Sequence, residues 1–291
     1  MQQGQPGRAV VVGVDGSRNA LRAVRWAAAE AARRRAPLRL VTACPGRHAD
    51  EVAEHRSLDI VLGQATGALA EAAHVAERVQ QGLAVQRQLV AGPPVPVLHA
   101  QARKAQLVVV GDRGRGGVGG WPLGSVAAAL GRCAVCPVVV VRGEDGPPDP
   151  ARPVVVGVDG TSTSDAAVAF AFSAAAARAV ELVAVHTWWE LLDTIAPYAG
   201  SDAIEARERE VLDERLAGWC GKYPDVPVRR LVERDLPAHA LTELSREAQL
   251  VVVGSRGRGW LAGMVLGSVS QTLLHRAHCP VAVVPVEPVT S

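Results

Sequence analysis

Aromatic side chains are scarce in this chain of 291 residues: Phe, Trp and Tyr together make up only 3% of it. The sequence also lacks a run of 18 apolar residues, which argues against a membrane-spanning helix. Its net charge of +2 is too small to indicate nucleic acid or a membrane surface as a partner. Five cysteines, an odd number, do not make a disulfide framework, and the first residues show no secretory signal pattern. We therefore expect a cytoplasmic protein.

Small apolar residues are abundant instead, and they occur in segments that are repeated. The stretch "VVVGVDGS" at 10–17 returns as "VVVGVDGT" at 154–161, and "AQLVVVG" at 105–111 returns unchanged at 248–254. A period of 143 to 144 residues indicates a duplicated domain and not a solenoid.

The sequence also indicates where one copy ends and the next begins. Between the copies lies "RGEDGPPDPAR" at 142–152, which is rich in Pro, Gly and acid and has no apolar period. We therefore predict one domain over 1–143, a linker over 144–151 and a second domain over 152–291.

Within each copy, strand-like and helix-like segments alternate. Strands are expected at 8–14, 37–43, 83–90, 107–111 and 137–141, and again near 153–158, 181–186, 227–232, 250–253 and 281–285. In the first copy, helices are expected behind an N-cap at Ser17, over 57–82 and 94–104, and from near Gly124. This alternation predicts an α/β fold with a doubly wound, mostly parallel sheet in each half, flanked by helices. Ligands of such sheets bind past the carboxyl ends of the strands, at the topological switch point.

The loop after the fourth expected strand has the composition of a phosphate site. It reads "LVVVGDRGRGGVGGWPLGSV" at 107–126 and "LVVVGSRGRGWLAGMVLGSV" at 250–269. Glycines let backbone N–H groups approach an anion, and a helix beginning near Gly124 adds further donors. Ser125 can donate to a phosphate oxygen, and Asp15, at the end of the first strand, can accept from a sugar or an amino group. The equivalent residues in the second half complete a second nucleotide site of this kind.

The spacing Gly111-x2-Gly114-x9-Gly124-Ser125, repeated from Gly254, resembles the ATP-binding motif of the universal stress protein family. The first strand "VVGVDGS" and the last strand "CPVVVV" are also similar to that family. The resemblance implies a cytoplasmic stress-response protein with a five-stranded α/β domain in each half. It implies contacts to ATP from Gly13, Asp15, Val110, Gly111, Gly114, Gly124, Ser125 and Val126, and from Gly157, Asp159, Val253, Gly254, Gly257, Gly267, Ser268 and Val269.

Three classes of function remain open at this point. The favoured one is an ATP-binding regulatory module, with or without Mg²⁺ beside the nucleotide, acting on an unknown protein partner and associating as a dimer of tandem chains. The second is a slow ATP hydrolase, and the third is an interaction protein with vestigial nucleotide sites. No lysine clamp, Mg²⁺-binding carboxylate pair or general base can be named beside the loop, so we assign no catalytic and no metal-binding residue.

Some finer expectations can also be tested against a structure. Gly114 and Gly257 are predicted to need both space beside the phosphates and left-handed backbone freedom. The cysteines of "CAVC" at 133–136 are interpreted as small buried residues, and Trp188 and Trp189 as either packed or stacked on an adenine. The second site is predicted to bind ATP more tightly, because its loop has two fewer glycines to order.

Overall fold

The structure is a computed structural model that describes residues 8–44, 52–116, 123–133, 135–143, 149–188, 201–257 and 266–286, with backbone alone at 52–58 and 201. Within these ranges, no helix combines the length and the apolar character that a membrane crossing needs. The chain divides into two compact units, Met1–Val141 and Arg142–Ser291. The division falls between residues 141 and 142, whereas the predicted linker covers 144–151, and each unit is described by itself below.

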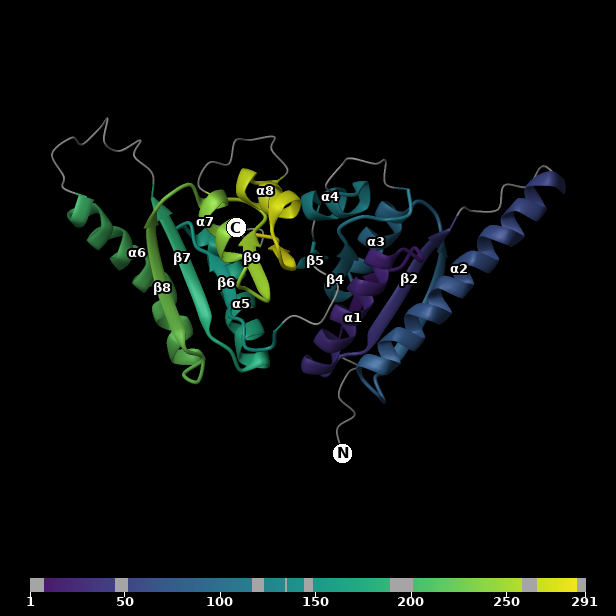
Figure 1. The fold of residues 1–291 in the computed structure, drawn as a ribbon, viewed down its shortest axis with the longest axis horizontal. Coiled ribbons are helices and arrows are strands. Elements are labelled where there is room, and N and C mark those ends of the chain that lie inside the picture. Colours follow the sequence, from purple (N-terminus) through teal and green to yellow (C-terminus); the bar gives the residue numbers. More distant parts are fainter. Residues whose placement is uncertain are drawn as a thin grey trace. The chain divides into compact units, whose positions relative to one another are not determined.

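The first unit alternates strands and helices, as the sequence predicts (Figure 1). In chain order its elements are β1 (Ala9–Gly13), α1 (Arg18–Arg33), β2 (Leu38–Cys44), α2 (Val52–Val79), β3 (Val85–Ala91), α3 (Pro94–Ala102), β4 (Ala105–Gly111), α4 (Ser125–Arg132) and β5 (Val138–Val141). Helix α2 begins five residues before its predicted start.

The second unit repeats this order with one addition, a short 3₁₀ turn (η1) before its first helix. Its elements are β6 (Val154–Gly157), η1 (Ser162–Ser164), α5 (Asp165–Arg178), β7 (Leu182–Trp188), α6 (Ser201–Lys222), β8 (Val228–Arg234), α7 (Pro237–Leu244), β9 (Leu250–Gly254), α8 (Ser268–Arg276) and β10 (Val281–Val284).

The strand order confirms the doubly wound α/β fold in both units. It is β3-β2-β1-β4-β5 in the first unit and β8-β7-β6-β9-β10 in the second. Within each unit, the neighbouring strands pair in parallel. The chain reverses its direction across the sheet after β3 and after β8, so right-handed crossovers place the first two helices of a unit on one face and the last two on the other.

The residues explain why each segment takes its form. Val10, Val11 and Val12 of β1 are wholly buried, as expected of a strand that has helices on both faces. The polar strand β3 stands at one end of the sheet, where four of its seven residues are exposed. The predicted N-cap is confirmed, since Oγ of Ser17 accepts a hydrogen bond from N of Ala20 at 3.1 Å.

Candidate functional site

The switch point of each sheet lies between the two strands at which the winding reverses. In the first unit these are β1 and β4, and in the second they are β6 and β9. All sixteen predicted site residues lie at or just beyond the carboxyl ends of these strands, or at the start of the helix that follows. In the first unit Gly13 ends β1 and Asp15 follows it, Val110 and Gly111 end β4, Gly114 lies in the loop, and Gly124, Ser125 and Val126 open α4. In the second unit Gly157 ends β6 and Asp159 follows it, Val253 and Gly254 end β9, Gly257 lies in the loop, and Gly267, Ser268 and Val269 open α8.

A pocket with a volume of about 480 Å³ opens at the switch point of the second unit. Its lining contains all eight residues predicted for this half. Strand β7 and helix α7 add apolar surface from Val185, Pro237 and Leu241, while β9 and α8 contribute mostly glycine and serine. This volume, with an apolar side and a few polar groups, is typical of a site for a small organic ligand.

The helices that close the two sites begin without a side-chain cap. Gly124 is the N-cap of α4 and Gly267 that of α8, and neither offers a side-chain acceptor to the first turn. Ser125 and Ser268 are exposed at these helix starts. Uncapped N–H groups and the positive end of a helix dipole make such a start suitable for an anion.

Backbone hydrogen bonds close the neck of each glycine loop. N of Gly124 donates to the carbonyl of Asp112 at 2.7 Å, and N of Gly267 donates to that of Ser255 at 2.9 Å. The strand end and the helix start are therefore joined in each unit. The middle of each loop, residues 117–122 and 258–265, lies outside the described residues, so Pro122 and Trp260 cannot be placed.

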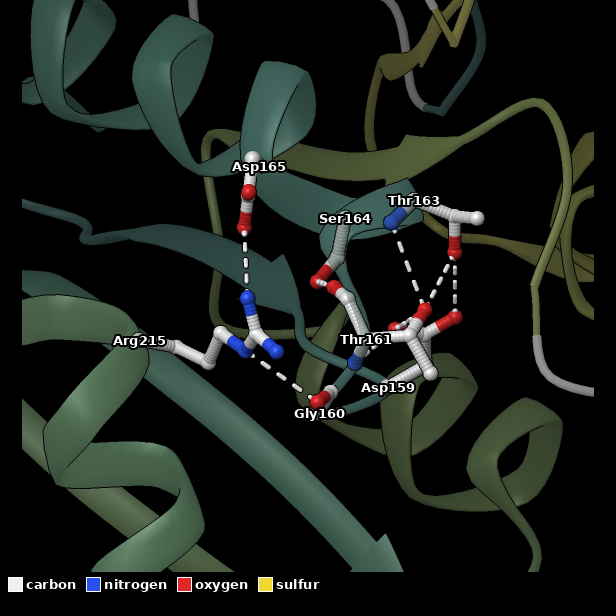
Figure 2. A network of polar contacts seen from close by, with 7 residues as sticks. All are labelled: Asp159, Gly160, Thr161, Thr163, Ser164, Asp165 and Arg215. Carbon is white, nitrogen blue, oxygen red and sulfur yellow. Dashed lines mark hydrogen bonds and ion pairs between the residues drawn. The ribbon is translucent and has the colours of Figure 1, made fainter. Parts of the chain in front are cut away.

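Asp159 is held by the turn that follows it (Figure 2). Its Oδ1 accepts from N and Oγ1 of Thr161, both at 2.8 Å, and its Oδ2 accepts from Oγ1 of Thr163 at 2.8 Å. The two threonine hydroxyls also lie 2.6 Å apart. Two carboxylate oxygens offer about four acceptor sites, so Asp159 keeps capacity for a ligand donor.

Asp15 has different partners. Its Oδ1 accepts from N of Ser17 at 2.9 Å, but its Oδ2 accepts from N of Arg115 at 2.8 Å. Arg115 belongs to the glycine loop, 100 residues further along the chain. The sequence indicates that Asp15 and this loop share a site, but it contains no signal that they bond to each other.

Space, and not backbone conformation, explains the glycines of the motif. A Cβ on Gly111 would lie 2.7 Å from the backbone carbon of Asn19, and one on Gly114 would overlap Oδ2 of Asp15. On Gly257 it would lie 3.3 Å from Oδ2 of Asp159. The expected left-handed backbone at Gly114 and Gly257 is wrong; positive φ occurs instead at Gly16 and Gly160, beside the two aspartates.

The structure also decides the cysteine interpretation. Cys136 is buried as expected, but Cys133 is exposed, which corrects that part of the prediction. Burial raises the pKa of the Cys136 thiol to about 11 and that of its counterpart Cys279 to about 12, so neither supplies a thiolate at neutral pH.

Trp188, the last residue of β7, does not provide an adenine platform in this pocket. Trp188 is buried and is not among the pocket residues, although its neighbour Thr187 is. Side chains alternate along a strand, which places Trp188 on the other face from Thr187. Trp189 lies outside the described residues.

Comparison with known proteins agrees with this architecture. The sequence model of the universal stress protein family matches residues 7–142 and again residues 150–285. A universal stress protein of Mycobacterium tuberculosis strain H37Rv is 43% identical over 287 residues, which cover 94% of this chain and 96% of that protein. A second one from the same strain is 41% identical over 298 residues, covering 97% and 98%.

A solved structure shows the same fold. The crystal structure of a universal stress protein from Archaeoglobus fulgidus DSM 4304 covers 97% of this chain and 99% of that chain, with 21% identity and a TM-score of 0.70. Since the family model matches both halves over almost their whole length, this chain belongs to the universal stress protein family as a tandem of two domains.

Proposed function

We propose that the chain binds ATP at the pocket of the second unit and at the equivalent place in the first, and that it acts as a nucleotide-dependent regulatory module in the stress response. The observation that carries this proposal is the pocket of about 480 Å³, whose lining contains every residue that the motif indicates for the second half. The glycine loop and the uncapped start of α8 suit the phosphates, and Asp159 suits the nucleoside.

Regulation is favoured over hydrolysis by the groups around the pocket. Among the described lining residues the one carboxylate is that of Asp159, and its oxygens already accept three hydrogen bonds. A carboxylate held in this way suits binding better than proton transfer. We therefore assign at most weak ATP hydrolysis. All five cysteines are free, in keeping with the cytoplasmic location that we propose.

Titration calorimetry of the purified chain with ATP tests the proposal, with GTP and cyclic AMP as competing ligands. Wild type should bind ATP, and Asp15→Asn with Asp159→Asn should bind it poorly, since each amide keeps only one acceptor oxygen. Asp59→Ala, at an exposed acid on α2, is the matched control. Circular dichroism and thermal unfolding must show that the double variant is folded. Unchanged ATP affinity in that variant would sink the assignment of the sites.

Association of the chain into dimers, and a protein partner that reads the nucleotide state, stay predictions from the family resemblance. Multi-angle light scattering with and without ATP measures the first. A mass that stays that of one chain at high concentration, in both conditions, would contradict it.

A further inference from the structure

Helix α6 contacts the Asp159 turn directly through Arg215. Nε of Arg215 donates to the carbonyl oxygen of Gly160 at 3.1 Å, and its Nη1 lies 3.7 Å from Oδ1 of Asp165 (Figure 2). The guanidinium thus joins α6 both to the turn and to the first residue of α5. Its side chain is only 35% exposed, so solvent screens these contacts in part.

This contact controls the orientation of a peptide group that holds the carboxylate. The Gly160 carbonyl and the Thr161 N–H belong to one planar peptide unit, so holding the carbonyl also fixes the direction of the N–H. That same N–H donates to Oδ1 of Asp159 at 2.8 Å. Gly160 has a φ of +75°, a conformation that costs a glycine little. The hydrogen bond from Arg215 to its carbonyl restrains this flexible residue.

A second link from α6 reaches the carbonyl on the other side of Asp159. Nδ1 of His186, on β7, lies 2.7 Å from the carbonyl oxygen of Val158, and its Nε2 lies 2.7 Å from Oε2 of Glu208 on α6. A carbonyl only accepts, so Nδ1 donates to Val158, and the contact between Nε2 and Oε2 of Glu208 needs a further proton shared by those two atoms. His186 is completely buried, so both nitrogens of its ring need partners within the protein. The carbonyl groups of Val158 and Gly160, the residues before and after Asp159, are therefore both linked to α6.

Among the described residues of the first unit, the counterparts of His186 and Arg215 make no such link between α2 and the Asp15 turn. Oγ1 of Thr42, at the position of His186, donates its one hydrogen to the Val14 carbonyl at 2.8 Å. Ala65 and Ala72 of α2 stand 143 residues before Glu208 and Arg215, the offset at which "AQLVVVG" repeats. Alanine side chains carry no polar group, so α2 has nothing at these positions with which to hold the Asp15 turn.

We propose that α6 sets the nucleotide affinity of the second site, with Arg215 and the His186–Glu208 pair as positioning residues that hold Asp159 in its binding orientation. This inference rests on the function proposed for the pocket. Linkage is reciprocal, so nucleotide in the second site also strengthens the attachment of α6, whereas α2 lacks these two polar links to the Asp15 turn. Nucleotide binding at the second site thus changes how firmly a helix is attached, and binding at the first site does not act through these links.

The test uses the full chain with Asp15→Ala, which leaves the second site as the one to be titrated with ATP. Adding Arg215→Ala should raise the Kd roughly three- to tenfold, the usual range for the loss of one hydrogen bond. Arg209→Ala, which removes an exposed pair with Glu205 on the same helix, should leave the Kd unchanged. His186→Thr gives β7 the residue of β2 and should weaken binding to a similar degree. Arg215→Lys should recover part of the loss, since one ammonium can still reach Gly160.

Two further readouts separate positioning from general support of the fold. In the ligand-free protein, Arg215→Ala should speed amide hydrogen exchange at Thr161, while Arg209→Ala should not. Tested in the Asp159→Ala background, Arg215→Ala should leave the affinity of the first site unchanged.

If wild type binds no ATP, the proposed function fails, and the exchange rate at Thr161 still decides whether Arg215 holds the turn. If wild type binds ATP but Arg215→Ala matches Arg209→Ala in Kd, the positioning role is overturned and the proposed function stands. A lower melting temperature with an unchanged Kd, or equal weakening of both sites, also overturns it.

Discussion

Asp15 and Asp159 occupy the same position in the two halves, and Oδ1 of each accepts from the amide two residues further on. Their Oδ2 atoms, however, accept from different parts of the chain. Oδ2 of Asp15 accepts from the amide of Arg115, in the glycine loop, at 2.8 Å. Both oxygens of Asp159 accept from Thr161 and Thr163, in the turn behind it. In the first half, an amide of the glycine loop therefore donates to the carboxylate of Asp15. In the second half, the carboxylate of Asp159 is held by its own turn, and Asp159 lines the pocket.

The difference shows that equal motif spacing does not make equal sites. A ligand that bonds to Asp15 has to share the carboxylate with Arg115 or displace it, and a typical hydrogen bond of this kind contributes about 1 kcal/mol. A ligand at Asp159 meets an aspartate that is already oriented by other residues. The second site is therefore the better organised of the two before any ligand arrives.

The largest effect is expected from valine in the glycine loops. Gly114→Val should weaken the first site by about 30-fold or more, because its Cβ would overlap Oδ2 of Asp15 and the branched side chain would force the loop outward. Gly257→Val should cost the second site less, about tenfold, since its Cβ would lie 3.3 Å from Oδ2 of Asp159. Calorimetric titration with ATP, in backgrounds where the other site is disabled by Asp→Ala, measures each loss.

Gly82→Ala, at a positive-φ glycine with open space around its side-chain position, controls for a mere loss of stability. If ATP raises the melting temperature of the Gly114→Val, Gly257→Val double variant as much as that of wild type, these loops do not hold the phosphates. Equal losses at both sites would show that the contacts of Gly114 and Gly257 with the aspartates do not decide the outcome.

Most of the fold could be predicted from the sequence because its signals are local. The run of valines in β1 and the repeated loop are each readable within a few residues, and the duplication supplied an internal check. The position of the switch point could also be predicted, because only a few topologies are possible for strands that alternate with helices. The boundary of α2 was less accurate, because its first residues show no clear apolar period to mark the start.

The contacts that distinguish the two sites could not be predicted in this way. The bond from Arg115 to Asp15 spans 100 residues, and the one from Arg215 to Gly160 spans 55. The histidine at 186 was the one available signal, because a polar residue amid the apolar run of β7 needs a buried partner. That this partner is Glu208 depends on how α6 packs against β7, and no local sequence pattern predicts that packing.

The comparison of the sites themselves is tested by disabling one at a time. Asp15→Ala keeps the second site and Asp159→Ala keeps the first; the second should bind ATP roughly 5- to 30-fold more tightly, or about 1–2 kcal/mol. One reason is the two additional glycines of the first loop, whose backbone freedom a ligand must restrict. The other is the competition from the Arg115 amide.

Both single variants must be titrated at the same ionic strength, because the screening of phosphate charge depends on salt. Wild type should then show two classes of site whose affinities match those of the single variants. Equal affinities, or tighter binding in Asp159→Ala, would mean that direct contacts to the nucleotide outweigh the ordering of the loop.

The smallest expected effect concerns the charge at the neck of the loop. Asp112 in the first half is buried beside Arg22, with Nη2 and Oδ1 3.2 Å apart, whereas Ser255 stands at the equivalent place in the second half. A carboxylate near the phosphate loop opposes the binding of a polyanion, although Arg22 offsets part of its field. Asp112→Asn, in the Asp159→Ala background, should tighten ATP binding about two- to fivefold, or roughly 0.5–1 kcal/mol.

Asparagine keeps the size and an acceptor oxygen of Asp112, so Arg22 retains a partner and the change is chiefly one of charge. Two comparisons separate this charge effect from a change of shape. The gain should be larger for ATP than for AMP, which carries fewer negative charges, and it should shrink as salt is raised. Thermal unfolding reports any cost of weakening the buried pair. A gain of the same size for both nucleotides, or one that salt does not alter, would contradict the electrostatic origin of this part of the difference between the halves.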